Sequence, residues 1–295
     1  MLPSLYTAVS GLDAQQRDLD VIANNVANAT TVGFKSSRVD FADLYNQLLA
    51  GATAPQTQAP TFGGVNPQSV GTGVTIAAID TDMNQGQVQT TGMPTDLMIN
   101  GNGFFVVGRD TGAGPTYAYT RAGDFHLDAN GNLVTSDGLF VYGYDPNGPA
   151  TGAPTYPIAI PSVWVAKNPP NPNEPANGAQ LESWSIGQNG TVTAVYNGTT
   201  YSLGQLALAT FNNPGGLQKS DNTRFVASAN AGVPLYGTPD APGFGQVLQN
   251  RLELSNVNLG RELSNMLVAQ SAYQANARVL STDNTILQTL VTLGR

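Results

Sequence analysis

Apolar residues at both ends of the chain recur alternately three and four positions apart. This spacing predicts amphipathic helices, each with a heptad seam. The C-terminal pattern covers residues 259–291, a helix about 50 Å long, for which Ser255 is the candidate N-cap. The two seams pass through Leu5, Val9, Leu12, Gln16, Leu19, Ala23 and Val26, and through Leu259, Leu263, Met266, Gln270, Tyr273, Ala277, Leu280, Asn284, Leu287 and Val291.

The middle of the chain has the pattern of antiparallel strands. Residues 51–250 hold most of the 33 glycines and 19 prolines. Asn-Gly pairs at 130–131, 189–190 and 197–198 are typical of hairpin turns. Runs of apolar and β-branched residues predict strands over 74–79, 103–107, 139–144, 156–160 and 205–211.

These patterns predict an α+β protein with several domains, in which a discontinuous terminal α-helical coiled-coil domain accompanies a mainly antiparallel β central domain. The Pro-rich stretch 168–178 has no core-forming pattern. We expect a terminal helical assembly domain over 1–50 and 251–295, a linker over 51–73, a β domain over 74–145 and 201–250, and a small β insertion or extended loop over 146–200.

The apolar stripe at the C-terminal end is wider than one facing helix can cover. Exposed stripes of this size indicate a partner, and the simplest partner is another copy of the chain. The alternative is that the two terminal helices cover each other as an antiparallel pair inside one chain. The residues that widen the stripe beyond the seam are Val268, Val279, Ile286, Leu290 and Leu293.

Composition excludes several classes of function. Of all residues 41% are apolar but only 11% are charged, and the net charge of −8 argues against nucleic acid as a partner. The chain has no cysteine, which excludes disulfides and thiol chemistry. No apolar run approaches the roughly 20 residues of a membrane span, so we expect no direct membrane insertion. The first residues lack the basic and apolar regions of a cleavable signal peptide.

The sequence offers no candidate catalytic, cofactor-binding or metal-binding residues, so we expect a protein that is not an enzyme and needs no cofactor. His126 is the single histidine and is expected to be a partly exposed strand residue. The Asp128–Asn132 stretch lacks the spacing of a calcium loop. Two other classes stay open: a secreted hydrolytic β-protein, which needs paired carboxylates, and a carbohydrate-binding module, which needs Trp164 and Trp184 on an exposed platform.

Five ordered motifs resemble the bacterial flagellar axial proteins of the rod and hook. The stretch SGLDAQQRDLDVIANNVANATTVGFKSSRVDF at 10–41 is similar to the N-terminal signature of that family, and 252–293 to its C-terminal signature. The stretches TDLMINGNGFFVV at 95–107, YTRAGDFHLDANGNLVTSDGL at 119–139 and LALATFNNPGGL at 206–217 resemble its β-domain motifs.

The resemblance implies a structural subunit of the flagellar hook, self-assembling into a flexible helical tube that transmits torque from rod to filament. The stretches at 139–146 and 209–217 look more like hook proteins. The alternative is the distal rod, a rigid drive shaft, because the opening of the chain and its modest length fit that protein as well. The implied location is the hook-basal body, reached by export without a cleavable signal peptide. Besides the chain itself, the implied partners are adjoining rod and hook-filament junction proteins and the hook cap during assembly.

Within that resemblance, the terminal helices would order when neighbouring subunits bury their seams. The first helix would end in an Asn-rich turn, where the asparagines bond backbone and neighbouring subunits. Gly33 would permit a turn and Phe34 would attach the chain to the β domain. The expected assembly residues are Leu5, Val9, Leu12, Leu19, Ile22, Asn24, Asn25, Val26, Asn28, Gly33, Phe34, Leu259, Leu263, Met266, Tyr273, Leu280, Leu287 and Val291.

Overall fold

The computed structural model describes residues 2–55, 63–110, 114–146, 148–149, 151–165 and 175–294. The chain divides into two compact units, each discontinuous in sequence. The terminal unit comprises Met1–Ala27, Ser37–Asp82 and Asn258–Arg295, and the central unit comprises Asn28–Ser36 and Met83–Val257. This division differs from the expected one, because residues 51–82 group with the terminal helices, while Asn28–Ser36 and residues 251–257 group with the β unit.

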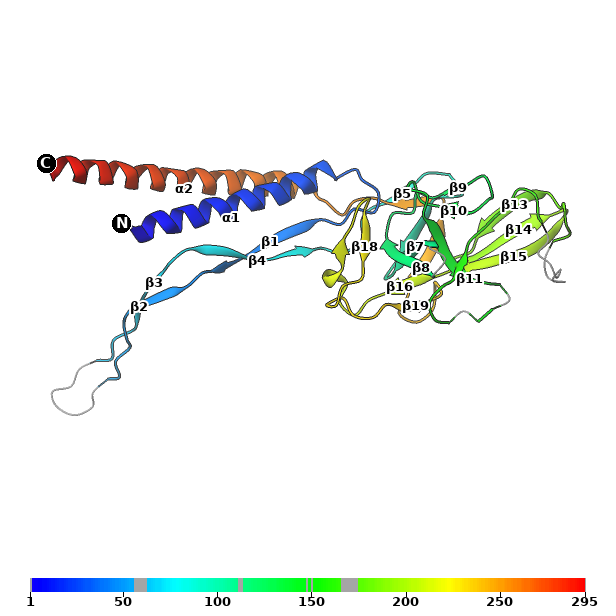
Figure 1. The fold of residues 1–295 in the computed structure, drawn as a ribbon, viewed down its shortest axis with the longest axis horizontal. Helices are drawn as coiled ribbons and strands as arrows, with labels where there is room; N and C mark the ends of the chain where they lie inside the picture. The colour runs from blue at the N-terminus through cyan, green and yellow to red at the C-terminus, as the bar shows by residue number, and fades with distance from the viewer. Residues whose placement is uncertain are drawn as a thin grey trace. The chain divides into compact units, whose positions relative to one another are not determined.

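The terminal unit contains a pair of long helices, α1 (Leu2–Ala27) and α2 (Leu259–Leu293). They contact each other and run antiparallel, with the two chain ends at the same end of the pair (Figure 1). The helix predicted over 259–291 is therefore confirmed. The predicted N-cap is wrong: the cap is Asn258, whose side-chain oxygen accepts a hydrogen bond from the Arg261 backbone N–H at 3.1 Å.

Two antiparallel ladders complete the terminal unit. Strand β1 (Ser37–Asp43) pairs with β4 (Val74–Thr81), and β2 (Asn46–Ala50) pairs with β3 (Gln68–Gly71). Helix α1 contacts both β1 and β4. The expected linker over 51–73 thus contains strand β3, whose backbone groups find partners on β2, a non-local pairing that composition does not encode. Residues 56–62 of that linker lie outside the described residues.

The central unit is an antiparallel β structure (Figure 1), which confirms the α+β class. Among the described residues, 13 strands form one sheet, and β6 pairs with β20 and β5 with β21 beside it. The bounds are β5 Val88–Thr90, β6 Leu97–Asn100, β7 Phe104–Asp110, β8 Pro115–Thr120, β9 His126–Leu127, β10 Leu133–Val134, β11 Phe140–Tyr144, β12 Tyr156–Pro157, β13 Leu181–Ile186, β14 Thr191–Tyr196, β15 Thr199–Leu206, β16 Leu208–Thr210, β17 Gln218–Lys219, β18 Arg224–Val226, β19 Leu235–Gly237, β20 Gln246–Gln249 and β21 Arg251–Glu253, with a 3-10 turn at Pro214–Gly216.

The three predicted hairpin turns are confirmed. They join β9 to β10, β13 to β14 and β14 to β15, and all three pairs are antiparallel. Gly131, Gly190 and Gly198 have φ of 81°, 76° and 77°, which glycine adopts without strain. The described part of the expected insertion over 146–200 extends the central sheet, because β13 and β14 continue it beyond β15.

Side chains on the two faces of the sheet enter two separate cores. Phe105 and Val107 belong to one core with Leu97 and Ile99, while Phe104 and Val106 belong to the other. Successive residues of a strand point to opposite faces, so the continuous apolar run of β7 serves both cores. The sheet of the central unit therefore has an apolar core on each of its two faces.

Tyrosines in the central unit make its stability sensitive to alkaline pH. Burial, followed by nearby Tyr236, raises the pKa of Tyr117 to about 12, and burial raises that of Tyr196 to about 12. A raised folded-state pKa favours the neutral phenol, so this contribution is complete below pH 10 and is lost between about pH 10 and 12. Urea unfolding across that window is expected to show falling stability, and Tyr117→Phe should flatten the fall. An unchanged pH profile in that variant would contradict the assignment.

Neither described helix is long and apolar enough to cross a membrane.

Candidate assembly site

The two helices cover only part of each other's apolar surface. The buried residue of α2 is Ala269, and the outward positions Leu267 and Val268 are 65% and 70% exposed. Such a surface is unusual for a chain that acts alone. The exposed large apolar residues of the two helices are Tyr6, Val9, Leu259, Leu263, Leu267, Val268, Tyr273, Val279, Ile286, Leu290, Val291 and Leu293.

Helix α1 packs against α2 and the β1–β4 ladder mainly through small residues. A Cβ added at Gly11 would lie 2.6 Å from the side-chain nitrogen of Asn276 on α2, so glycine allows this close approach. Ala8 and Ala14 are buried as well, as is the larger Ile22. Of the predicted N-terminal assembly residues, Val9 and Asn24 are exposed, Ile22 and Asn25 are buried, and Leu5, Leu12, Leu19 and Val26 are half-buried.

The side of α2 that faces inward is offset from the predicted seam. The half-buried or buried positions include Glu262, Ala269, Asn276 and Asp283, which a search for apolar spacing passes over. The two patterns share Met266, Ala277, Leu280 and Leu287, all half-buried, whereas the predicted seam residue Tyr273 is exposed. The remaining predicted positions on α2, Leu259, Leu263 and Val291, are exposed.

The Asn-rich turn after α1 has a specific role within one chain. Asn25 is 2% exposed, and its side chain donates to the Ser37 carbonyl at 2.7 Å and accepts from the Ser37 N–H at 2.9 Å. These two bonds connect the last turn of α1 to the first residue of β1. In the central unit, Asn28 accepts a hydrogen bond from the Thr31 hydroxyl at 3.1 Å. Bonding of these asparagines between subunits stays a prediction.

Asn25→Ala is expected to lower the free energy of unfolding of the terminal unit by about 1–3 kcal/mol, because it removes both bonds to Ser37 and leaves buried polar groups behind. Helix circular dichroism during urea unfolding measures this loss. Gln16→Ala is the matched control, since Gln16 is an exposed amide on the same helix, and it should change stability by less than about 0.5 kcal/mol. Equal losses in the two variants would refute a special role for Asn25.

The Gly-Phe-Lys motif docks on the central unit. Gly33 has φ of 68°, its N–H donates to the Glu253 carbonyl at 2.8 Å, and an added Cβ would clash with the backbone of Ala122. Phe34 is half-buried, with the Lys219 ammonium 5.2 Å from its ring centre. Gly33 thus makes the turn that the sequence predicted, and Phe34 contacts the β unit.

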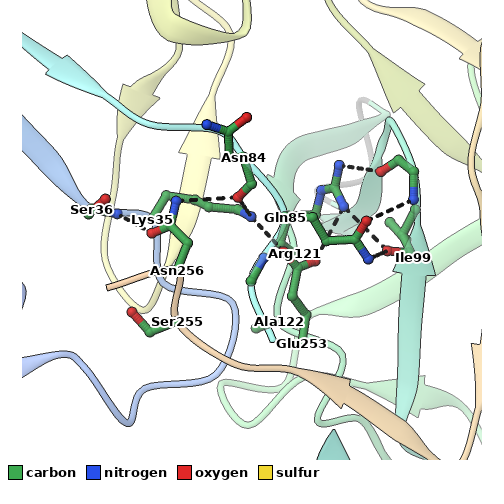
Figure 2. Close-up of polar contacts among 12 residues, drawn as sticks. Lys35, Ser36, Asn84, Gln85, Ile99, Arg121, Ala122, Glu253, Ser255 and Asn256 are labelled. Atoms are coloured by element: carbon green, nitrogen blue, oxygen red, sulfur yellow. Dashed lines mark hydrogen bonds and ion pairs between the residues drawn. The ribbon is translucent and has the colours of Figure 1, made fainter. Parts of the chain in front are cut away.

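Lys35 and Arg121 hold a single buried carboxylate between them (Figure 2). The Lys35 ammonium lies 2.6 Å from Glu253 Oε1, and an Arg121 nitrogen lies 3.2 Å from Glu253 Oε2. Glu253 is 0% exposed, Lys35 2% and Arg121 5%. We call these three residues the Glu253 cluster. The sequence analysis missed it, because Lys35 and Glu253 are 218 positions apart and no local pattern links them.

Neighbouring backbone groups complete the Glu253 cluster. Lys35 also donates to the Asn84 carbonyl at 2.7 Å, and Arg121 donates to the Gly101 carbonyl at 2.8 Å. The Gly86 N–H donates to Glu253 Oε1 at 2.9 Å. Burial lowers the pKa of Arg121, and the Glu253 charge opposes that shift. Two cations around one anion, all withdrawn from water, make Glu253 the residue on which the cluster depends.

The histidine and the two tryptophans singled out in the sequence do not form a common site. His126 is an exposed residue of β9. Trp164 is 8% exposed and packs edge-on against Tyr196, and Trp184 is half-buried against the same core, so the two tryptophans form no exposed platform. Within the part of the chain that the structure describes, no three His, Asp or Glu side chains gather as a metal-ligand set.

The fold and the uncovered helix faces define a class of protein: an α+β chain with a discontinuous helical unit suited to association. Comparisons with known proteins specify the family. Three family models match: "Flagella basal body rod protein" over 5–35, "Flagellar hook protein FlgE/F/G D1 domain" over 98–194 and "Flagellar basal body rod FlgEFG protein C-terminal" over 248–293.

Full-length relatives agree with these matches. The Flagellar basal-body rod protein FlgG of Bacillus subtilis is 39% identical over 297 aligned positions that cover 100% of both chains, and that of Borreliella burgdorferi is 35% identical with 97% of both covered. The Flagellar hook protein FlgE of Borreliella burgdorferi is 28% identical over 447 positions, with 99% of this chain and 100% of that protein covered. The chain belongs to the family of flagellar hook and rod axial proteins. Membership of this family implies self-polymerisation within the flagellar basal body.

Proposed function

We propose that this protein is a structural, non-catalytic subunit of the flagellar axis, and that it builds the rod rather than the hook. The observation that favours the rod over the hook is the length of the alignment with each relative. The similarity to FlgG of Bacillus subtilis runs over 297 positions and covers both chains completely, close to the 295 residues of this chain. The alignment with the hook protein of Borreliella burgdorferi extends over 447 positions, although it covers nearly the same residues of this chain. Extra segments in the hook protein account for that difference.

In the proposed rod, the exposed face of α2 is covered by helices of neighbouring copies. Each copy would present one surface to the subunit ahead and a different surface to the subunit behind, and such heterologous contacts build a helix rather than a closed ring. Long helices with most of their apolar face in water are marginal, so burial between copies also supplies their stability. The exposed apolar residues of β2, Leu48 and Leu49, add surface of the same kind.

The proposed neighbours are further copies of this chain together with adjoining rod and hook proteins, and the proposed location is the bacterial flagellum. The sequence features at 139–146 and 209–217 that resemble hook proteins keep the hook as the second candidate.

Electron microscopy of polymers grown from the purified full chain tests the proposal. Straight, rigid tubes are the expected result for a rod subunit. Curved, flexible tubes would assign the chain to the hook instead. A chain that stays monomeric at every concentration up to its solubility limit would contradict a role as an axial subunit.

A further inference from the structure

The Asn28–Ser36 segment takes most of its anchoring bonds from residues near the far end of the chain. Gly33 bonds the backbone of Glu253, and Lys35 bonds the Glu253 carboxylate. The Ser36 N–H donates to the Asn256 side chain at 2.8 Å, across 220 positions of sequence. These residues all belong to the central unit. These three bonds therefore form only when β21 and the residues after it are in place.

Lys35 makes this docking depend on charge. Its ammonium group is withdrawn from water, and a buried cation is tolerated only beside an anion. The carboxylate of Glu253 is the anion at 2.6 Å (Figure 2), and Lys35 also donates to the neutral Asn84 carbonyl. An apolar side chain of similar length at position 35 would carry no such requirement.

We propose that Lys35 is a positioning residue that makes docking of the N-terminal Gly-Phe-Lys motif conditional on the carboxylate of Glu253. A chain in which residue 253 has not yet joined the central unit would expose Lys35 to water and leave residues 33–36 undocked. The N-terminal signature would then be held in place only in chains that are complete through β21. That this dependence on Glu253 selects complete chains during assembly rests on the proposed function. The docking of residues 33–36 can be measured on the isolated full chain.

The partners of Lys35 explain why removing the lysine differs from removing the glutamate. In Lys35→Met, Glu253 keeps Arg121 and the Gly86 N–H, and the Asn84 carbonyl keeps the Asn256 side chain at 3.3 Å. In Glu253→Gln, Lys35 loses the charge that compensates it. The first change should leave the motif docked, and the second should release it.

Hydrogen exchange of the Gly33 and Ser36 amides in the full chain tests the proposal. Glu253→Gln is expected to speed their exchange by about 30-fold or more, and Lys35→Met to change it by less than about threefold. The double variant Lys35→Met/Glu253→Gln should slow both amides at least about threefold relative to Glu253→Gln, but not fully to the wild-type rate, because Arg121 still lacks its anion. The matched control is Lys219→Met/Glu253→Gln, because Lys219 also bonds this segment, through the Lys35 carbonyl at 3.0 Å. That control should stay fast.

Fast exchange in Lys35→Met alone would overturn the proposal, as would a double variant whose two amides exchange as fast as in Glu253→Gln. Should Glu253→Gln itself fail to fold, Glu253→Asp replaces it, because the shorter side chain keeps the negative charge in the cluster while lengthening its 2.6 Å contact with Lys35. All these measurements use the monomer, so they are independent of whether the polymer proves to be rod, hook or neither.

Discussion

Glu253→Gln is expected to lower the free energy of unfolding of the central unit by about 3–5 kcal/mol, the loss typical when one partner of a buried ion pair is removed. The effect should be this large because the carboxylate compensates both Lys35 and Arg121, and all three side chains are buried. Denaturant unfolding followed by tryptophan fluorescence measures it, since Trp164 and Trp184 both pack in the central unit.

Glu182→Gln is the matched control for this loss. Glu182 is an exposed residue of β13 in the same unit, and its neutralisation should change stability by less than about 0.5 kcal/mol. A Glu253→Gln chain as stable as the Glu182→Gln chain would show that the buried charges are compensated in some other way.

Leu267→Asp combined with Val268→Asp should block polymerisation and leave the isolated chain as stable as before. The two side chains are 65% and 70% exposed in one chain, so the lone chain loses almost nothing. If neighbouring copies bury them, each contributes about 1.5–3 kcal/mol to association. The loss of both should raise the critical concentration for polymerisation at least about 100-fold, since each 1.4 kcal/mol is a factor of ten.

Sedimentation of polymer at a series of protein concentrations gives that critical concentration. The control is Gln270→Asp combined with Gln274→Asp, which adds the same two charges at exposed polar positions of α2 and removes no apolar surface. A normal critical concentration in the Leu267→Asp/Val268→Asp chain would mean that this face of α2 stays in water in the polymer. A block by Gln270→Asp/Gln274→Asp as severe as by Leu267→Asp/Val268→Asp would attribute the effect to charge alone.

Local spacing in the sequence was enough to predict the C-terminal helix and the three hairpins. The helix over 259–291 and the three Asn-Gly hairpins depend on residues a few positions apart, and all are found. The N-cap of α2 was misplaced because both Ser255 and Asn258 are capable caps, and only the backbone shows which side chain reaches an amide of the first turn. The pairing of β2 with β3 was missed because it joins residues across a long, composition-biased stretch.

The candidate site was predictable only in part, for two physical reasons. The predicted seam on α2 includes Met266, Leu280 and Leu287, but polar Glu262 and Asn276 share the inward side with them. Apolar periodicity cannot register polar residues that become half-buried in a helix pair. Contacts between Lys35 and Glu253 depend on the whole central sheet being folded, so neither the Gly-Phe-Lys motif nor the residues around 253 predict them alone.

The central claim is that sister subunits cover the apolar face of α2. Because the chain has no cysteine, Leu267→Cys introduces a single thiol on that face, and its rate of labelling by a thiol reagent can be compared in monomer and polymer. Val233→Cys, at a residue of the central unit that is 82% exposed, gives the reference rate. The account predicts labelling near the reference rate in the monomer and at least about 100-fold slower in the polymer. Equal labelling of Leu267→Cys in monomer and polymer would contradict it.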